Sequence, residues 1–231
     1  MKVLVTAGPT REFIDPVRFL SNPSTGRMGF AVARAARAAG HEVALIAGPV
    51  ALRTPKGVRR IDVVSARDML AAIEAETFDC LIATAAVADW RPARMAVKKL
   101  KKREMAGTLK LVRNPDILKT VAAKLRGERG RTNFRVERRQ ILVGFAAETG
   151  EPTAEAVRKC REKRLDLVVA NDVTAAGSGF GTATNRVSFV FPDGRIERLP
   201  LLSKAAVARR IVNAVKELVA DKSGLFLSRD L

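Results

Sequence analysis

The stretch that decides the fold is Lys2-Val-Leu-Val-Thr-Ala-Gly8, a nearly continuous apolar run that ends in a glycine. Apolar runs of this length are typical of strands buried on both faces of a parallel sheet. A long loop follows, and residues 28–39 (Met-Gly-Phe-Ala-Val-Ala-Arg-Ala-Ala-Arg-Ala-Ala) then read as a helix with Gly40 as its C′ cap. Strand, loop and helix in this order predict the first unit of an α/β fold.

The alternation of strand-like and helical patterns continues along the chain. Buried strands are predicted at residues 42–47, 60–64, 79–83, 141–146 and 167–170, and helices at 65–76, 114–125 and 153–164. Ser65 with Asp68 forms a capping-box-like helix start. Asn114-Pro115 supplies an N-cap and a first helical residue for the helix that follows it.

The pattern changes after the glycine-rich segment 177–181. Residues 186–191 and 195–199 flank a Pro-Asp-Gly turn and predict a β-hairpin, after which Ser203 caps a last helix to about residue 220. We therefore predict an α/β fold, Rossmann-like and doubly wound, with a mainly parallel sheet and a late β-hairpin. In this interpretation residues 1–231 form a single domain and residues 222–231 a loose tail.

The composition indicates a globular protein of the cytoplasm. Hydrophobic residues make up 47% of the 231 residues, enough for a packed core. No apolar run approaches the ~20 residues that a membrane-spanning helix requires, and the N-terminus lacks the pattern of a signal peptide. Two cysteines, Cys80 and Cys160, and a single histidine, His41, give no set of zinc ligands and favour a reducing compartment. His41 is interpreted as a surface turn residue.

The formal net charge of +18 is concentrated in three stretches. Residues 91–113 contribute a net +8, residues 124–139 a net +5 and residues 158–164 a net +4. Nucleic-acid binding is one interpretation, but the chain has no Tyr, a single Trp and no alternation of aromatic and basic residues for base stacking. Clustered cations also suit small polyanions, such as a nucleoside triphosphate or a phosphorylated acid.

Residues 85–106 show no periodicity and form a basic loop of about twenty residues. Loops of this length inside a compact domain are more often functional than idle. Residues 91–105 combine high charge with little apolar pattern, so nothing in them favours docking on the body of the protein. We predict that they form a lid, mobile without ligand and ordered by a bound triphosphate.

The loop after the first strand has neither the G-x-G-x-x-G fingerprint nor a P-loop pattern. It is rich in small and hydroxyl residues and leads straight into a helix, whose first N–H groups favour a bound anion. An ordinary loop rich in turn formers is the alternative interpretation. The predicted phosphate and substrate loop comprises Gly8, Thr10, Arg18, Ser21, Ser24, Thr25, Gly26, Met28 and Gly29, together with Ala86 from a later segment.

The chain resembles the bacterial phosphopantothenoylcysteine synthetases in several segments that occur in the same order. The opening runs from Thr6-Ala-Gly-Pro-Thr-Arg11 through Asp15-Pro-Val-Arg-Phe-Leu-Ser-Asn-Pro-Ser-Thr-Gly-Arg-Met-Gly29. Four further segments are Ala85-Ala-Val-Ala-Asp-Trp-Arg91, Lys99-Leu-Lys-Lys102, Asn114-Pro-Asp-Ile117 and Gly144-Phe-Ala-Ala-Glu-Thr149. Lys159, Lys163, Leu165-Asp166 and Ala170-Asn171-Asp172 complete a resemblance that spans roughly residues 3–190.

This resemblance implies a ligase that joins L-cysteine to 4′-phosphopantothenate in coenzyme A biosynthesis. Its co-substrate would be CTP, used with Mg²⁺, and the intermediate an acyl-cytidylate that the cysteine amine attacks. In many bacteria a flavin-dependent decarboxylase domain precedes the synthetase. Because this chain begins at the synthetase's first strand, we expect no FMN and a separate decarboxylase protein. A homodimer is also implied, and the hairpin at 186–199 would offer exposed edge strands for it.

The resemblance assigns catalytic roles to Asn22 and Lys99. The Asn22 carboxamide would donate to the acyl carbonyl oxygen, and Lys99 would reach the triphosphate from the lid. The resemblance places no metal ligands. It implies a nucleotide site formed by Ala83, Thr84, Ala85, Asp89, Lys99, Asn114, Pro115, Asp116, Ile117, Phe145, Lys159 and Lys163.

Simpler interpretations of these residues stay open. Asn22 in Ser-Asn-Pro is ordinarily a turn former, and Phe145 is equally suited to the core. Lys159 and Lys163 are one helical turn apart and repel each other unless an anion lies between them. The chain departs from many relatives at Pro23, Thr25 and Trp90, without loss of a polar group that the assignment uses.

Two other functions are alternatives to the ligase. A basic nucleotide- or RNA-binding module of the same fold without catalysis would explain the charge, although Asn22 and Lys99 argue against it. A reductase with a nucleotide cofactor is poorly supported, because the dinucleotide fingerprint and tyrosine are both missing.

Overall fold

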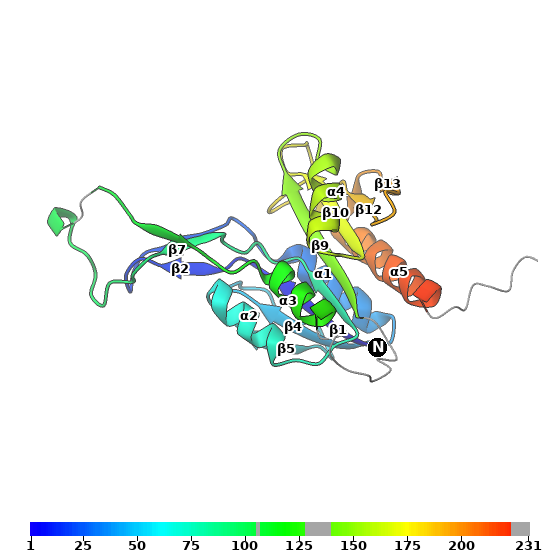
Figure 1. Ribbon diagram of the computed structural model, residues 1–231, viewed down its shortest axis with the longest axis horizontal. Coiled ribbons are helices and arrows are strands. Elements are labelled where there is room, and N and C mark those ends of the chain that lie inside the picture. The colour runs from blue at the N-terminus through cyan, green and yellow to red at the C-terminus, as the bar shows by residue number, and fades with distance from the viewer. Residues whose placement is uncertain (105–106, 128–139, 223–231) are drawn as a thin grey trace, which may run out of the picture.

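The structure is a computed structural model that describes residues 1–104, 107–127 and 140–222. Its centre is an eight-stranded sheet with the order β13-β12-β10-β9-β6-β1-β4-β5 (Figure 1). Two antiparallel strands, β12 (Ser188–Val190) and β13 (Ile196–Arg198), form one edge. The other strands are parallel: β1 (Lys2–Ala7), β4 (Glu42–Ala47), β5 (Arg59–Asp62), β6 (Cys80–Ala83), β9 (Ile141–Glu148) and β10 (Leu167–Asp172).

The winding direction of the sheet reverses between β1 and β6. From β1 the chain moves outward to β4 and β5, then returns to β6 on the other side of β1 and continues to β9 and β10. Loops that leave the carboxyl ends of β1 and β6 therefore run toward opposite faces and leave a crevice between them. Open α/β sheets bind their ligands at such a switch point.

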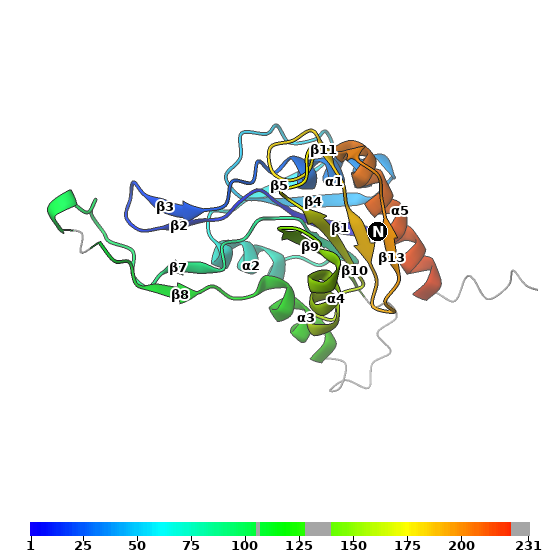
Figure 2. The ribbon, with the colours of Figure 1, turned by 90° about the horizontal axis from the view of Figure 1, so that it is seen from above.

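Helices cover both faces of the sheet (Figures 1 and 2). The helices α1 (Arg27–Ala38) and α5 (Lys204–Lys222) pack on one face. The helices α2 (Ala66–Glu74), α3 (Ile117–Gly127) and α4 (Thr153–Glu162) pack on the other. Along β1, Val3 and Val5 join the first apolar cluster and Leu4 the second, which explains why this strand is apolar at successive positions.

Two antiparallel hairpins project from this sheet. One pairs β2 (Arg11–Phe13) with β3 (Phe19–Ser21), and the other pairs β7 (Trp90–Pro92) with β8 (Leu111–Arg113). A 3-10 turn, η1 (Lys102–Glu104), lies between β7 and β8, and both views show the hairpins extending away from the sheet (Figures 1 and 2). We call the described residues of 11–21 and 90–113 the arm, and the eight-stranded sheet with its helices the body.

The predicted Rossmann-like fold with its late hairpin is confirmed, and β12 and β13 lie where the hairpin was expected. Cys80 and Cys160 are both buried, and no disulfide joins them. A further short pair, β11 (Thr184–Asn185) with β14 (Leu202–Ser203), lies before α5. The Ser203 hydroxyl accepts from the Ala206 N–H at 3.2 Å and so caps this last helix, also as predicted.

Three expectations need correction. The sequence predicts loops at 8–26 and 85–106, but both segments contain short strands. These strands escape prediction because three residues are too few to show a period. Helix α3 begins at Ile117, since the Asp116 carboxylate, and not Asn114, accepts from the Lys119 N–H at 3.0 Å. His41 is half-buried rather than on the surface, and its Nε2 has no hydrogen-bond partner within the described part of the chain.

The predicted tail lies beyond the described residues except for Lys222, which ends α5. No helix in the described ranges is long and apolar enough to span a membrane.

Candidate functional site

The segment that follows β6 is fixed against the end of β1 by a set of short hydrogen bonds. The Thr84 hydroxyl donates to the Thr6 carbonyl at 2.7 Å, and the Ala85 N–H donates to the Thr6 hydroxyl at 3.3 Å. The Ala86 N–H continues this pattern by donating to the Gly8 carbonyl at 2.9 Å. Side-chain hydroxyls and backbone groups together therefore join the two strand ends that border the crevice.

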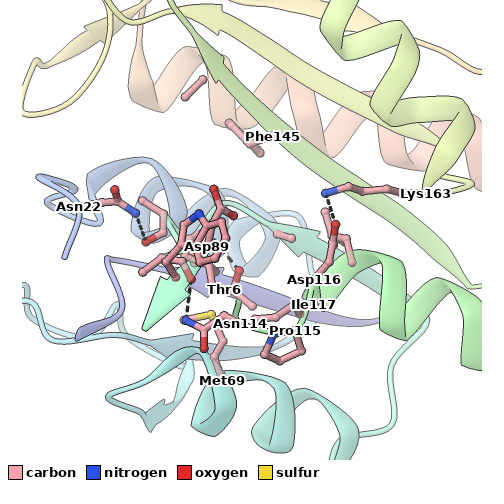
Figure 3. A pocket seen from close by; sticks show the side chains of 18 of the residues that line it. Thr6, Asn22, Met69, Asp89, Asn114, Pro115, Asp116, Ile117, Phe145 and Lys163 are labelled. Atoms are coloured by element: carbon pink, nitrogen blue, oxygen red, sulfur yellow. Dashed lines mark hydrogen bonds and ion pairs between the residues drawn. The ribbon is translucent and has the colours of Figure 1, made fainter. Parts of the chain in front are cut away.

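A cavity of about 620 Å³ opens at this point. Its walls come from the loops after β1, β6 and β8, from the start of α3, from β9 and from α4 (Figure 3). Residues of the predicted nucleotide site that line it are Ala83, Ala85, Asp89, Asn114, Pro115, Asp116, Ile117, Phe145, Lys159 and Lys163. Segments that lie far apart in the sequence thus meet at a single cavity.

Asn22 also lines this cavity, and Figure 3 shows its side chain beside the loop that follows β6. Its Nδ2 donates one hydrogen bond to the Ala86 carbonyl at 3.1 Å. A carboxamide nitrogen carries two hydrogens, so this bond orients the group and leaves a second N–H for a ligand. The position suits a neutral donor aimed at a developing oxyanion.

The wall formed by Asn114 is built by interactions with the segment after β6. The Asn114 Nδ2 donates to the Ala88 carbonyl at 2.8 Å, and its backbone N–H donates to the Asp89 carbonyl at 2.8 Å. Arg91 donates to the Asn114 Oδ1 at 3.1 Å. Asn114 therefore joins the base of the arm to the body, a role that the predicted helix N-cap did not indicate.

Lys159 of α4 and Lys163, the C-cap residue of this helix, line the cavity, each with a carboxylate partner. The Lys159 Nζ lies 2.6 Å from a Glu148 oxygen, and the Lys163 Nζ lies 2.8 Å from Asp116 (Figure 3). Burial opposes ionisation of Asp116, but the hydrogen bonds from Lys163 and from the Lys119 N–H outweigh it and lower the pKa of this carboxyl. The expectation that these two lysines repel each other without a bound anion is therefore wrong, because Glu148 and Asp116 compensate their charges.

Lys99 does not line the cavity in this structure. It is exposed on the arm, where its neighbours are tied to the turn between β2 and β3. The Leu100 N–H donates to Asp15 at 3.2 Å, and Arg18 donates to the Leu100 carbonyl at 2.9 Å. Arg18 also donates to the Asp15 carboxylate, through its Nε and through the same Nη2 that donates to Leu100. The structure thus places Lys99 and Arg18 together on the arm and away from the predicted nucleotide site.

A smaller cavity of about 120 Å³ adjoins the first and shares Ala85, Ala86, Phe145, Ala147 and Phe180 with it. It lies at the amino end of α1, where Gly26 is the N-cap and offers no side chain to the helix N–H groups. The predicted loop residues that line it are Ser24, Thr25, Gly26, Met28, Gly29 and Ala86, and Thr84 of the predicted nucleotide site lines it as well.

Gly29 allows α1 to approach the sheet at this cavity. A Cβ at this position would lie 2.4 Å from the Thr84 hydroxyl oxygen and 2.5 Å from the Ala7 Cβ. The same close approach brings the first N–H groups of α1 to the edge of the sheet, where a ligand can meet them.

Three other residues of the predicted loop support the site without lining either cavity. The Thr10 hydroxyl accepts from the Ala88 N–H at 3.0 Å, and Ser21 donates to the Thr10 carbonyl at 2.7 Å. Gly8 has φ +77°, and a Cβ there would lie 3.0 Å from the Val50 Cγ1. These residues hold the loop in shape, which is a structural role that the sequence did not distinguish from ligand contact.

Several residues that line the cavities were not predicted. The smaller cavity also includes Arg27, Asn171, Gly179, Phe180, Asn185 and Lys204, and the larger one includes Thr6, Met69, Trp90 and Arg113. The glycine-rich run 177–181 was a visible signal for part of this set, because glycines after a buried strand often border a ligand. Nothing in the sequence marked Lys204, which follows an ordinary helix cap.

The described residues contain no group of three or more His, Cys, Asp or Glu side chains that could hold a metal ion. Two carboxylates, Asp89 and Asp116, do line the larger cavity. A Mg²⁺ ion that arrives with a polyphosphate usually keeps several waters and needs only one or two carboxylates. The residues present fit that mode of binding.

Comparison with known proteins identifies relatives over most of the chain. The family model of the DNA/pantothenate metabolism flavoprotein C-terminal domain matches residues 1–219. The coenzyme A biosynthesis bifunctional protein CoaBC of Vibrio vulnificus is 44% identical over 221 residues, which are 94% of this chain and 52% of that protein. The chain therefore spans about half the length of the curated relatives it matches.

Solved structures agree with this match. The crystal structure of the C-terminal domain of a bifunctional CoaBC superposes with a TM-score of 0.76 at 40% identity, covering 95% of this chain and 96% of that one. A Cab2 mutant in complex with phosphopantothenate-cysteine shares the fold with a TM-score of 0.73 at 16% identity, covering 96% and 88%.

Proposed function

We propose that this chain, which belongs to the family of the DNA/pantothenate metabolism flavoprotein C-terminal domain, is a ligase that joins L-cysteine to 4′-phosphopantothenate through an acyl-nucleotide. The relatives that it matches are bifunctional proteins of coenzyme A biosynthesis. The observation that carries the proposal is the pair of adjoining cavities at the switch point of the sheet, with Asn22 and Ala86 at their boundary.

The larger cavity is the proposed site of the nucleoside triphosphate, with CTP as the expected co-substrate. Its volume of about 620 Å³ lies within the range of ~300–1,000 Å³ for small-molecule sites. Lys159 and Lys163 line it and now pair with Glu148 and Asp116. A bound triphosphate would replace these two carboxylates as the partner of the lysines. Mg²⁺ bound to the triphosphate would supply further charge neutralisation there, with Asp89 and Asp116 as its available carboxylates.

The first half-reaction activates the acid. A carboxylate oxygen of 4′-phosphopantothenate attacks the α-phosphorus, and a new O–P bond forms as the bond to the pyrophosphate oxygen breaks. Negative charge increases on the leaving pyrophosphate, so cations accelerate this step by stabilising its transition state. Lys99 contributes only when the arm brings it to the cavity, which is the proposed role of residues 91–105 as a lid.

The second half-reaction transfers the acyl group. The cysteine amine attacks the acyl carbon and loses a proton, the C–N bond forms, and the nucleoside monophosphate leaves with the former carboxylate oxygen. The oxyanion that develops on the acyl carbonyl needs a donor. Asn22 supplies one through its second amide hydrogen, while its first is held by the Ala86 carbonyl.

The test is pyrophosphate release with CTP, ATP, GTP or UTP, measured with and without 4′-phosphopantothenate. We expect release that depends on 4′-phosphopantothenate, and product formation when cysteine is added. Release with none of the four nucleotides would overturn the ligase. Nucleotide or RNA binding without any turnover would instead support a binding module of the same fold.

We also propose a homodimer. The outer edge of β13 has no strand beside it in the described sheet, and the arm carries exposed apolar side chains, so two surfaces are available. Light scattering at micromolar concentration should give twice the monomer mass, and a monomer alone would contradict the proposal.

A further inference from the structure

The two cavities meet at a junction whose side chains are all apolar. The residues that line both cavities are Ala85, Ala86, Phe145, Ala147 and Phe180. None of these side chains carries a hydrogen-bonding group, although amides, hydroxyls and charged groups line the cavities on either side. A ligand that occupies both cavities therefore crosses an apolar passage at this point.

Phe180 reaches the junction from the glycine-rich segment 177–181. Gly179, which precedes it, has φ +89°, and a Cβ at this position would lie 2.7 Å from the Val173 carbonyl oxygen. Only glycine fits so close a turn. Val173 directly follows β10 and lines the smaller cavity, so the turn packs against the end of a central strand and places Phe180 beside the cavities.

The backbone on both sides of Phe180 is anchored by cationic side chains. The Gly179 carbonyl accepts from the Lys204 Nζ at 3.0 Å, and the Gly181 carbonyl accepts from Arg27 at 3.0 Å. The Phe180 side chain, in contrast, is 41% exposed. The segment is thus held by its main chain, and a bound ligand would cover the aromatic ring.

The acyl carbon lies beside this junction in the proposed mechanism. Asn22, the proposed donor to the acyl oxygen, lines the larger cavity and donates to the Ala86 carbonyl at 3.1 Å. Ala86 itself lines the junction. An acyl-nucleotide is a mixed anhydride, and water can attack it at the same carbon as the cysteine amine. Apolar side chains around this carbon would keep water away from it.

We propose that Phe180 covers the acyl-nucleotide at the junction and protects it from hydrolysis until the cysteine amine attacks. This inference rests on the proposed ligase function. Phe180 takes no part in bond making, and its effect is on which nucleophile reaches the acyl carbon. The covered ring would lose its contact with water in the same step, which favours the closed arrangement.

The side reaction that Phe180 prevents consumes CTP without forming product. The oxygen of a water molecule attacks the acyl carbon, and the bond from this carbon to the phosphate-bound oxygen breaks. CMP leaves with that oxygen, 4′-phosphopantothenate is regenerated, and both protons of the water pass to solvent. Each such event releases one CMP for which no cysteine adduct is formed.

A purely structural role of Phe180 predicts a different result. If the ring only stabilised the segment 177–181, its loss would lower pyrophosphate release and adduct formation together. CMP and adduct would then still form in equal amounts. The ratio of CMP to adduct therefore separates the two roles, whereas a loss of total activity does not.

The experiment measures CMP and cysteine adduct for the wild type, Phe180→Ala, Phe180→Leu and Leu201→Ala with CTP, Mg²⁺, 4′-phosphopantothenate and cysteine. Leu201→Ala is the matched control, because Leu201 is 42% exposed beside Gly177 and is not among the residues that line either cavity. The wild type and the control should form CMP and adduct in equal amounts. In Phe180→Ala, hydrolysis relative to transfer should rise by about 10-fold, which corresponds to ~1.4 kcal/mol between the two barriers. Phe180→Leu keeps an apolar side chain and should show a smaller rise.

Labelled water locates the attack. In a single turnover without cysteine in H₂¹⁸O, Phe180→Ala should form 4′-phosphopantothenate that carries the label and CMP that does not. Label in CMP would mean attack of water on the α-phosphorus and would overturn the proposal. Equal amounts of CMP and adduct in Phe180→Ala, or the same rise in Leu201→Ala, would overturn it as well.

Unfolding temperatures establish that the variants are folded. If Phe180→Ala does not fold, the ratio in Phe180→Leu decides the test, and a ratio equal to that of the wild type contradicts the proposal. A folded Phe180→Ala that releases no pyrophosphate would place Phe180 in the first half-reaction and would also contradict it. If the wild type releases no pyrophosphate at all, the ligase function itself fails.

Discussion

In the body, the apolar side chains of β1 and β6 are buried on both faces of the sheet, whereas in the arm the comparable side chains remain exposed. Leu81 in β6 has no exposed surface, but Leu111 in β8 is 39% exposed. Exposed apolar residues of the arm include Val17, Phe19, Trp90, Met95, Val97, Leu109 and Leu111. The body is thus stabilised by burial of apolar surface, whereas the arm depends on interactions of another kind.

Polar contacts around Asp15 hold the arm together. This buried carboxylate accepts from the backbone N–H groups of Val17, Arg18 and Leu100 and pairs with the Arg18 side chain. At the base of the arm, Glu12 is buried and accepts from the Ala66 N–H at the start of α2 at 2.9 Å. Burial of apolar surface therefore stabilises the body, whereas polar contacts hold the described part of the arm.

The largest expected effect is on the free energy of unfolding, which a substitution in the body should lower far more than a substitution in the arm. Leu81→Ala should lower the free energy of unfolding by about 2–5 kcal/mol, because it leaves a cavity in a packed core. Leu111→Ala in the arm should change it by no more than about 0.5 kcal/mol, because the side chain is already partly in water. Urea unfolding followed by circular dichroism measures both. Similar losses in the two variants would mean that the arm unfolds as part of the core.

The next prediction concerns the division of chemistry between the regions. Lys99→Gln in the arm should reduce formation of the acyl-nucleotide by about 100-fold or more, since one lost transition-state donor costs ~3 kcal/mol. Asn22→Asp at the edge of the body should form the acyl-nucleotide and let it accumulate, because a carboxylate repels an oxyanion. Mass spectrometry of quenched reactions, without and with cysteine, distinguishes these outcomes.

Two controls support that comparison. Lys98→Gln neutralises the neighbouring lysine and should leave the rate within about 2-fold, as expected for an exposed charge. Asn22→Asp needs an unfolding measurement, because the Asn22 amide also bonds the Ala86 carbonyl. If Lys99→Gln accumulates the intermediate and Asn22→Asp never forms it, the assignment of the two half-reactions is reversed.

The body was the more predictable of the two regions from sequence. The strands β1 and β6 are apolar at successive positions, and α2 begins with the capping box that Ser65 forms with Asp68. Ala85, which follows β6, and Phe145, which lies in β9, meet at the switch point because the topology brings these neighbouring strands together. The fold could therefore be derived from local patterns, whereas the proposed nucleotide site was implied by the resemblance in the order of motifs.

The arm and the smaller cavity could not be predicted in the same way. The arm depends on Asp15 and Leu100, which are 85 positions apart and show no joint pattern. Lys204 meets Gly179 only after the chain has formed β11, β12, β13 and β14 between them. Contacts of this kind arise from tertiary packing, and a periodicity of 2 or 3.6 residues carries no information about them.

A smaller effect is expected when the arm closes. Trp90, the single tryptophan of the chain, lies at the base of the arm, so its fluorescence reports on this region alone. CTP with Mg²⁺ should change this fluorescence and slow tryptic cleavage within residues 94–103 several-fold. Asp15→Asn removes the charge that binds Arg18, and cleavage without nucleotide should become faster. Equal cleavage of the wild type with and without nucleotide would contradict the lid.

The smallest effect is the dependence of stability on pH. It involves one titrating group in each region, Asp15 in the arm and His41 in the body, and the two titrate in different pH ranges. In the arm, the hydrogen bond from the Arg18 side chain outweighs burial and, with the three backbone N–H groups, holds the pKa of Asp15 well below its usual range. The stabilisation from this carboxylate is therefore complete above about pH 5 and is lost only as the pH falls below the unfolded value of about 4. Between pH 8 and 5.5, Trp90 fluorescence of the folded protein should stay constant.

His41 in the body behaves differently over the same range. Burial, followed by the positive charges of the Met1 amino group and Lys216, lowers its pKa below 6.5. The unfolded chain therefore takes up a proton first as the pH falls, and the body loses stability from about pH 7 down to the folded pKa of His41. The urea midpoint should decrease slightly between pH 7.5 and 5.5 in the wild type and remain flatter in His41→Gln. An identical decrease in both proteins would assign the pH dependence to other groups, and a parallel change in Trp90 fluorescence would show that arm and body respond to protons together.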